Sequence, residues 1–460
     1  MTFSVQDKRV VVVGGGRSGV AAAALLLARG ARVTLADTAP HLEHGAELER
    51  LGAALALGPH EPALFAAADL IVLSPGVPLE QEAIRAAQRA GVPVIGEVEL
   101  ASRWLTGRVI AITGTKGKST TTTLAARMLE EAGFDAIAGG NLGQALSAQV
   151  ARSRPESLHV VEVSSFQLES TETFHPWIAV LLNLSADHLD RHASVAAYGA
   201  AKARLFRRQT PDDWAVVNAD DPAALALARG GRARRFDFAL RAAVQDGVTV
   251  EDELIVRRDQ GAAAPLVPLA SVTLPGRHLL SDVLAAAAVG CLAGVPPAAM
   301  QRAVEQFHGL EHALERVTAL GGVEFVNDSK ATNILSARRA IESFDDGRGL
   351  VVIMGGRFKG GRFEDLRDVV AARAQAIVAI GEARPRIREA FVDLVAVYDA
   401  DSMGDAVRRA FAAATPGGVV LLAPACASFD MFRDYAERGR VFKEEVRHLA
   451  AEVGSSTGLQ

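Results

Sequence analysis

The stretch "VIAITGTKGKSTTTTLAARM", residues 109–128, constrains the fold of this chain more than any other. Its first four residues, 109–112, are apolar and predict a short buried strand, whereas Leu124 and Met128 have the spacing of one face of a helix. A glycine-rich turn therefore lies between the end of a strand and the N-terminus of a helix. This order of elements indicates an α/β fold in which the helix N-terminus faces a ligand.

The turn itself has the composition of a phosphate-binding loop. Gly114 and Gly117 allow the backbone to approach an anion, the free N–H groups of the helix point at it, and Lys118 adds a positive charge. Ser119 or Thr120 then offers a hydroxyl to the Mg²⁺ that accompanies a nucleoside triphosphate. The loop is shorter than the usual pattern, but the strand before it and the helix after it are the context that such a loop requires.

Strand and helix patterns alternate through the first hundred residues and predict a doubly wound, mostly parallel sheet. The first turn, residues 14–19, matches the dinucleotide fingerprint Gly-x-Gly-x-x-Gly, and Asp37 ends the second strand where a ribose or base contact is usual. Taken alone, these residues indicate an NAD-dependent oxidoreductase. Many nucleotide-binding sheets share this turn, however, and that reading leaves the phosphate loop unexplained.

Length and composition narrow the class of protein. With 460 residues the chain is too long for one core, and we expect three α/β domains, at 1–105, 106–309 and 310–460. The net charge of -5 argues against a nucleic-acid partner, and two cysteines support neither a disulfide framework nor a zinc site. The longest apolar run, 283–295, is too short to cross a bilayer and the start of the chain lacks a signal-peptide pattern, so we expect a cytoplasmic protein without a membrane partner.

Polar residues gather at strand ends in the middle domain. Glu162 lies in the apolar run "LHVVEV", where it either anchors Mg²⁺ beside the phosphate loop or faces solvent from an edge strand. The run "LLNLSADHLDRH" brings Asn183, Asp187 and His188 to one loop. Lys202 follows among alanines. It is either a surface lysine with a buried stem or a lysine whose lowered pKa lets it react with CO₂ and become a carboxylate-like metal ligand.

The third domain offers further polar strand ends. The segment "NDSKATN", residues 327–333, follows one strand, and "GGRFKGG" places Arg357 and Lys359 after another. Basic strand ends with flexible glycines suit a clamp on an anion already held by the phosphate loop. Ser428 follows a third strand and either caps the next helix or contacts a ligand, and the sequence leaves both readings open.

Taken in order, the motifs "GTKGKST", "GNLG", "EVSSFQLE", "DHLDRH", "YGAAK", "NDSKATN", "GGRFKG" and "PACASFDMF" resemble those of the Mur ligases along nearly the whole chain, most closely the D-glutamate-adding members. The resemblance implies a Rossmann-like UDP-binding domain, a central P-loop ATPase-type domain and a C-terminal Rossmann-like domain. It implies a ligase of peptidoglycan synthesis that uses ATP and two Mg²⁺ ions to join D-glutamate to UDP-N-acetylmuramoyl-L-alanine through an acyl phosphate. Nothing in the sequence demands more than a monomer. An L-alanine-adding Mur ligase and a non-catalytic ATP-binding regulator are the alternatives.

The same resemblance implies a role for individual residues. It places the UDP substrate against Gly16, Ser18, Asp37, Thr38, Ser74, Gly76, Asn141 and Gln167. It places ATP against Gly114, Thr115, Lys116, Gly117, Lys118, Ser119, Thr120, Asp282, Asn327, Asp328 and Lys330. It assigns catalysis to Lys118, His188, Lys202 and Lys330, magnesium to Ser119, Glu162, His188 and a carbamylated Lys202, and D-glutamate to Thr332, Lys359, Ser428 and Phe429.

Four places depart from the family pattern. Ala313 stands where an arginine usually follows the histidine. Leu279 and Asp282 stand where asparagines are usual, although Asp282 still offers an acceptor to the amino group of adenine. Lys116 replaces an asparagine of the phosphate loop, and Gly199 replaces a larger residue. These changes put the affinity for ATP in question and leave the reaction class standing.

Overall fold

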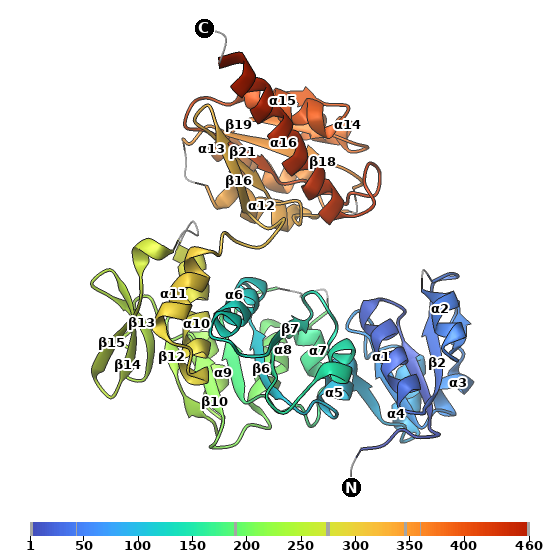
Figure 1. The fold of residues 1–460 in the computed structure, drawn as a ribbon. Helices are drawn as coiled ribbons and strands as arrows, with labels where there is room; N and C mark the ends of the chain where they lie inside the picture. Colours follow the sequence, from blue (N-terminus) through green and yellow to red (C-terminus); the bar gives the residue numbers. More distant parts are fainter. Residues whose placement is uncertain are drawn as a thin grey trace. The chain divides into compact units, whose positions relative to one another are not determined.

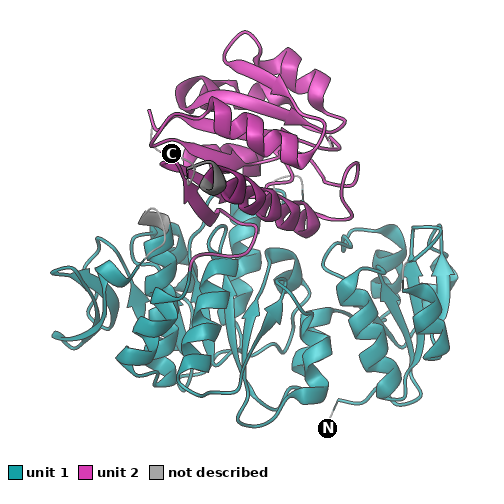
Figure 2. Ribbon diagram, turned by 45° about the horizontal axis from the view of Figure 1, so that its top comes forward, with its two compact units in different colours: residues 1–307 teal, residues 308–460 magenta. Residues whose placement is uncertain are grey.

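The computed structural model describes residues 3–42, 44–187, 191–272, 277–344, 347–358 and 360–457. The chain divides into two compact units, residues 1–307 and 308–460 (Figure 2). This division does not separate the first two sheets, and the three domain ranges given above stay predictions. Among the described helices, none combines the length and the apolar character that a membrane span requires.

The first sheet is wholly parallel, with the strand order β3-β2-β1-β4-β5 (Figure 1). Its central strands are apolar and buried, apart from the exposed Arg9 at the start of β1, because helices cover both faces. The order of the strands reverses beside β1, so the glycine turn after β1 lies at the switch point where such sheets bind ligands. The elements are β1 (Arg9–Val13), α1 (Arg17–Ala28), β2 (Arg32–Asp37), α2 (Gly45–Arg50), β3 (Ala54–Leu57), α3 (Pro62–Ala66), β4 (Leu70–Leu73), α4 (Glu82–Arg89), β5 (Val94–Gly96) and α5 (Glu97–Ser102).

The second sheet has six parallel strands in the order β11-β10-β9-β6-β8-β7. β6 lies between β8 and β9, so the phosphate loop leaves the middle of the carboxyl edge. The elements are β6 (Arg108–Thr113), α6 (Lys118–Glu131), β7 (Ala136–Gly140), the 3-10 helix Leu146–Arg152, β8 (Leu158–Glu162), α7 (Ser165–Glu169), β9 (Ile178–Leu181), α8 (Val195–Ala203), the 3-10 helix Arg204–Phe206, β10 (Trp214–Val217), α9 (Pro222–Ala228) and β11 (Arg234–Arg235).

A smaller sheet in the order β12-β13-β14-β15 follows, antiparallel except for the first pair. Residues 240–268 form most of this sheet. Its elements are β12 (Asp237–Phe238), β13 (Gly247–Glu251), β14 (Leu254–Asp259), β15 (Ala262–Pro268), the 3-10 helix Leu269–Ser271, α10 (Arg277–Ala293) and α11 (Pro297–Glu305). Helix α10 packs against both this sheet and α6.

The second unit has one sheet, in the order β16-β17-β21-β18-β19-β20, and only β16 runs antiparallel to its neighbour. Hydrophobic clusters fill both faces, one under α12 to α14 and the other under α15 and α16. The elements are β16 (Glu315–Leu320), β17 (Val323–Asn327), α12 (Ile334–Glu342), β18 (Leu350–Gly355), the 3-10 helix Phe363–Leu366, α13 (Arg367–Arg373), β19 (Ala374–Ile380), α14 (Arg384–Phe391), β20 (Ala396–Asp399), α15 (Met403–Ala413), β21 (Val419–Leu422) and α16 (Tyr435–Thr457).

Candidate active site

The phosphate loop joins the central strand β6 to helix α6. Gly117 precedes the helix with a φ of +83°, a left-handed conformation that favours glycine. No side chain caps the N-terminus of α6, so its first N–H groups face the space in front of the loop. The Nζ atom of Lys118 donates to the carbonyl oxygens of Gly114 at 3.1 Å and Thr115 at 3.0 Å. The charge of Lys118 therefore lies over the loop.

Asn183, at the end of the neighbouring strand β9, holds the shape of this loop. Its Oδ1 atom accepts the N–H groups of Thr115 at 3.0 Å and Lys116 at 2.9 Å, and its Nδ2 atom donates to the carbonyl of Lys116 at 3.1 Å. The sequence singled out Asn183 as one of several polar residues at a strand end, and the structure gives it this specific contact. Although Lys116 stands where an asparagine is usual, the loop keeps its support from Asn183, because Asn183 bonds only to the backbone of Lys116.

Glu162, the last residue of β8, is buried and reaches the start of α6. Its carboxylate accepts from the hydroxyl of Ser119 at 2.6 Å and from Nδ2 of Asn141 at 2.8 Å. The alternative reading of a solvent-facing carboxylate on an edge strand is therefore wrong. A carboxylate beside a serine hydroxyl at a phosphate loop supplies the hard oxygen ligands that Mg²⁺ prefers, so these residues fit that ion.

Lys202, on α8, points into the same loop. Its side chain is 1% exposed, and its Nζ atom lies 2.8 Å from the carbonyl oxygen of Gly114 and 4.5 Å from the ring centre of Tyr198. Burial, together with the nearby positive charge of Lys118, lowers its pKa to about 7. The alternative of a surface lysine is wrong, and a neutral amine is accessible at physiological pH.

The loop that carries Asp187 and His188 is only partly described, since His188 lies outside the described residues. His192 is buried between the hydroxyl of Ser165, at 2.9 Å, and the carboxylate of Glu169, at 3.2 Å. Those contacts give His192 a structural role. Within the part of the chain that the structure covers, no three His, Cys, Asp or Glu side chains form a group that could hold a metal ion.

Asp282, on α10, packs directly against the phosphate loop. A methyl group added at Gly117 would overlap its carboxylate, and the side chain is 6% exposed. Burial raises its pKa to about 7, although the charge of Lys118 opposes the rise. Gly199, another departure from the family pattern, lies against Leu184 and Leu227, where a side chain would crowd both leucines.

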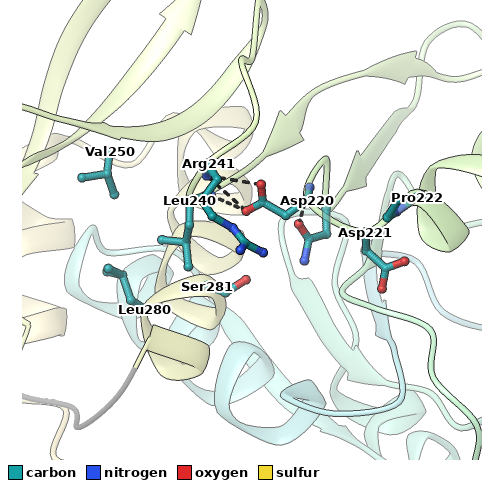
Figure 3. Close-up of a pocket in the computed structure, with 9 residues that line it drawn as sticks. Asp220, Asp221, Pro222, Leu240, Arg241, Val250, Leu280 and Ser281 are labelled. Carbon is teal, nitrogen blue, oxygen red and sulfur yellow. Dashed lines mark hydrogen bonds between the residues drawn. The ribbon is translucent and has the colours of Figure 1, made fainter.

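A pocket of about 660 Å³ opens beside the same helix (Figure 3). The carboxylate of Asp220 connects two segments of the pocket wall, because it accepts the N–H groups of Leu240 at 2.6 Å and Ala242 at 2.8 Å. Figure 3 shows that the Arg241 side chain extends into the opening. Its lining residues are Asn218, Asp220, Asp221, Pro222, Leu240, Arg241, Val250, Leu280 and Ser281.

The predicted UDP-substrate residues of the first sheet lie around its glycine turn. The hydroxyl of Ser74 donates to the carbonyl of Gly14 at 2.8 Å, which places the ends of β1 and β4 side by side. The carboxylate of Asp37 accepts the N–H groups of Gly15 at 2.6 Å and Ala39 at 2.8 Å. Asp37 therefore also shapes the turn, a role that its position at the end of β2 did not indicate.

Two arginines link this turn to the second sheet. Arg17 donates to the carbonyl of Gly143, two residues after the predicted substrate residue Asn141, at 2.9 Å. In the opposite direction, Arg191 donates to the carbonyl of Gly76 at 3.4 Å. The turn that carries Gly16 and Ser18, and the loop that carries Gly76, are thus each connected to a loop of the second sheet by a hydrogen bond.

In the second unit, Asn327 is the last residue of strand β17 and Asp328 follows it. Burial raises the pKa of Asp328 to about 7, and its carboxylate accepts the N–H group of Leu314 at 3.2 Å. The amide of Asn327 is fully buried and donates to Glu315 at 3.0 Å and to the carbonyl of Gly439 at 3.3 Å. Asn327 thus holds neighbouring segments together, and its predicted contact with ATP stays a prediction.

The predicted D-glutamate residues lie in the same unit. Ser428 is 2% exposed, and α16 begins only at Tyr435, so the reading in which Ser428 caps that helix is wrong. Phe429 is 56% exposed. Lys359 lies outside the described residues, while Thr332 and Lys330 follow Asp328 in the loop after β17.

The phosphate loop is supported by a buried carboxylate. A parallel nucleotide-type sheet precedes it in the chain, and the sheet of the second unit follows it. These features define a multidomain nucleotide-binding α/β protein. The "MurD-like, N-terminal domain" of the Mur ligases matches residues 8–96, the Mur ligase middle domain matches 112–290, and the Mur ligase "glutamate ligase domain" matches 314–426. The chain belongs to the Mur ligase family, and the three-part α/β architecture expected from the sequence is confirmed.

Relatives and solved structures agree with this membership. A UDP-N-acetylmuramoylalanine–D-glutamate ligase of Acidobacterium capsulatum is 44% identical over 96% of this chain and 97% of its own length. One of Koribacter versatilis is 42% identical over 98% and 99%. Among solved structures, the UDP-N-acetylmuramate-alanine ligase MurC of Thermotoga maritima aligns with a TM-score of 0.58 at 18% identity, covering 96% of this chain and 99% of its own. A pseudomurein peptide ligase type C of Methanothermus fervidus aligns with a TM-score of 0.56 at 16% identity, over 96% and 100% of the two chains.

Proposed function

We propose that this chain joins D-glutamate to UDP-N-acetylmuramoyl-L-alanine in the synthesis of peptidoglycan precursors and converts ATP to ADP and phosphate. The observation that carries the proposal is similarity over almost the full length to relatives named for this reaction, together with an intact phosphate loop. An L-alanine-adding ligase of the same family is the second candidate, because it would share the architecture.

The reaction has two chemical steps. First, the carboxylate oxygen of the alanyl group attacks the γ-phosphorus of ATP, ADP leaves, and an acyl phosphate forms. The amine of D-glutamate then attacks the carbonyl carbon, and the phosphate leaves with the former carboxylate oxygen while the amine loses a proton. Both steps bring negative charges together, so cationic groups at the loop, Lys118 above all, would stabilise them.

The residues around the phosphate loop suit these steps. The N–H groups at the start of α6 and the Nζ atom of Lys118 would bind the β- and γ-phosphates. Bound Mg²⁺ would neutralise the phosphate charge, and Ser119 and Glu162, whose oxygens lie 2.6 Å apart, would hold one such ion. A second site would use His188 and Lys202 after CO₂ adds to the neutral amine of Lys202, forming an N–C bond and releasing one proton.

The remaining predicted residues would bind the two substrates. The glycine turn with Ser18, Asp37 and Ser74 would hold the UDP group, and Asn141 and Gln167 would hold the sugar and peptide part. The Nε2 atom of Gln167 supports this role, because it is buried and has no hydrogen-bond partner among the described residues. Thr332, Lys359, Ser428 and Phe429 would bind D-glutamate, and Asp328 and Lys330 would contact ATP. We propose a monomer that works in the cytoplasm.

Phosphate release from ATP tests the proposal. Purified protein receives UDP-N-acetylmuramoyl-L-alanine and, in separate reactions, D-glutamate, L-glutamate or no amino acid. Parallel reactions contain UDP-N-acetylmuramate with L-alanine. Phosphate release only with UDP-N-acetylmuramoyl-L-alanine and D-glutamate supports the proposal. Release only with UDP-N-acetylmuramate and L-alanine supports the second candidate, and release in no reaction contradicts both.

A further inference from the structure

Arg438 is a buried charged residue to which the proposed reaction assigns no role. It lies in the first turn of α16 and is 0% exposed. Its Nε atom donates to the hydroxyl of Ser329 at 2.9 Å, its Nη2 atom to the carbonyl of Ser329 at 2.8 Å, and its Nη1 atom to the carbonyl of Cys426 at 3.0 Å. Burial lowers its pKa to about 10, so the guanidinium keeps its charge at neutral pH.

The partners of Arg438 are mainly backbone carbonyls. A buried guanidinium is usually paired with a carboxylate, because an unpaired charge is costly to remove from water. None of the ion pairs among the described residues includes Arg438, and its donors are satisfied by neutral oxygens. If stability alone mattered, a well-packed apolar side chain would occupy this position at a lower cost in folding free energy.

Those carbonyls belong to the ends of three adjacent strands. Ser329 follows β17, Cys426 follows β21, and Gly355, whose carbonyl lies 3.5 Å from Nη1, ends β18. The loops that begin there carry the residues predicted to bind ATP and D-glutamate, from Asp328 to Thr332 and at Ser428. One rigid, planar group therefore connects three loops at the carboxyl edge of the sheet.

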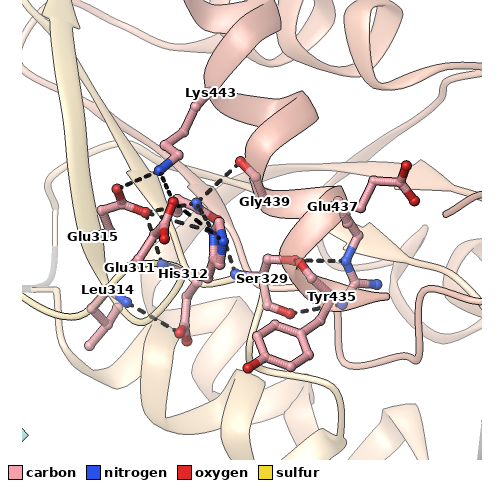
Figure 4. A network of polar contacts seen from close by, with 12 residues as sticks. Glu311, His312, Leu314, Glu315, Ser329, Tyr435, Glu437, Gly439 and Lys443 are labelled. Atoms are coloured by element: carbon pink, nitrogen blue, oxygen red, sulfur yellow. Dashed lines mark hydrogen bonds and ion pairs between the residues drawn. The ribbon is translucent and has the colours of Figure 1, made fainter. Parts of the chain in front are cut away.

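The first turn of α16 is itself fixed against the same loops (Figure 4). The hydroxyl of Ser329 donates to the carbonyl of Tyr435 at 2.7 Å, and Asn327 donates to the carbonyl of Gly439. A methyl group at Gly439 would overlap the ring of His312, so the helix approaches as closely as glycine permits. These contacts fix the part of the α16 backbone from which the Arg438 side chain extends.

We propose that Arg438 is a positioning residue that sets the spacing of the three loops that bind the incoming amino acid and the nucleotide phosphates. The ligands named for these loops rest on the proposed function, whereas the ordering of the loops by Arg438 does not depend on that function. The fork of Arg438 contacts two loops by strong hydrogen bonds and approaches the third. A lysine keeps the charge but not this geometry, so it cannot hold all three.

The test compares the full-length Arg438→Lys protein with wild type and with Arg440→Lys, a matched change at an exposed position on the same helix. Steady-state kinetics with varied D-glutamate are expected to show a KM increase on the order of 10- to 100-fold for Arg438→Lys. Arg440→Lys is expected to match wild type. Unchanged KM and kcat in a folded Arg438→Lys protein would overturn the proposal.

Amide hydrogen exchange separates this proposal from the proposed function. Faster exchange confined to residues 328–332 and 426–429 is expected in Arg438→Lys, even if no ligase activity is found with any substrate. If Arg438→Lys does not fold, Ser329→Ala, which removes one acceptor of the fork, takes its place and is expected to give the same pattern at smaller amplitude. Exchange that is unchanged in these loops, or that rises evenly across the second unit, would contradict a positioning role.

Discussion

The Nζ atom of Lys202 lies 2.8 Å from the carbonyl oxygen of Gly114, the first glycine of the phosphate loop. Helix α8 supplies the lysine and strand β6 leads into the loop, so two separate elements converge on this contact. The side chain is buried, which lowers its pKa to about 7 and leaves a substantial fraction of neutral amine at physiological pH. A lysine buried this deeply at the phosphate loop has a chemical role as its simplest explanation.

Replacement of Lys202 tests whether a carbamate forms there. If the carbamate is a metal ligand, Lys202→Ala is expected to lose activity on the order of 100-fold, and short carboxylic acids added to the assay are expected to restore part of it. Lys202→Arg is the matched control, since it fills the cavity and keeps the charge but forms no carbamate. Near-normal activity of Lys202→Ala without added acid would rule out the role.

Glu162→Gln tests the predicted magnesium ligand. The amide preserves the shape of the side chain and removes the negative charge; its oxygen can still accept from Asn141, while its NH2 group can donate to the Ser119 hydroxyl in a reversed hydrogen bond. We expect kcat to fall on the order of 100-fold and the Mg²⁺ concentration for half-maximal activity to rise. Glu156→Gln, at an exposed position ahead of the same strand, provides the control. An unchanged Mg²⁺ dependence in Glu162→Gln would count against Glu162 as a ligand.

Gly117→Ala and Gly133→Ala form a matched pair at the two ends of α6. Both glycines are left-handed, with φ of +83° and +84°, so each alanine costs roughly 1–2 kcal/mol of backbone strain. Only at Gly117 would the methyl group also overlap Asp282, whereas Gly133 has open space. We expect both variants to lower Tm, but only Gly117→Ala to weaken ATP binding in calorimetry. Equal ATP affinities would disprove the tight approach of Asp282 to the loop.

The phosphate loop and most strands could be predicted because they have strong local patterns: an apolar run, then glycines, then helical spacing. Strands β3, β16 and β20 are harder to predict, since they lie at the edges of their sheets and are only partly buried. The place of Glu162 beside Ser119 followed from the rule that parallel strands end at one edge. The burial of Arg438 could not be predicted, because an arginine in the first turn of an amphipathic helix has the sequence pattern of a surface residue.

His159 gives the middle domain a specific pH dependence. Its ring is fully buried, with Nδ1 donating to Gln149 at 2.9 Å and Nε2 accepting from Ser153 at 2.8 Å, and burial lowers its pKa to about 4. Between pH 6.5 and 4 the unfolded chain binds a proton here that the folded chain does not, so stability falls as the pH falls. The loss at pH 5 is about 2 kcal/mol.

Melting temperatures at pH 7.5 and pH 5 check this expectation. The decrease in Tm between the two values is expected to be smaller in His159→Gln than in wild type, because the variant has no group to protonate. His448→Gln, at an exposed position, is expected to keep the wild-type decrease. An equal decrease in all three proteins would refute the assignment of this pH dependence to His159.

Isotope transfer tests the proposed reaction most directly. UDP-N-acetylmuramoyl-L-alanine labelled with ¹⁸O in its alanyl carboxylate is incubated with ATP, Mg²⁺, D-glutamate and the purified protein, and both products are analysed by mass spectrometry. We predict one ¹⁸O atom in the released phosphate for each new amide bond, because the carboxylate oxygen leaves with the phosphate. Amide formation with unlabelled phosphate, or phosphate release without an amide product, would contradict it.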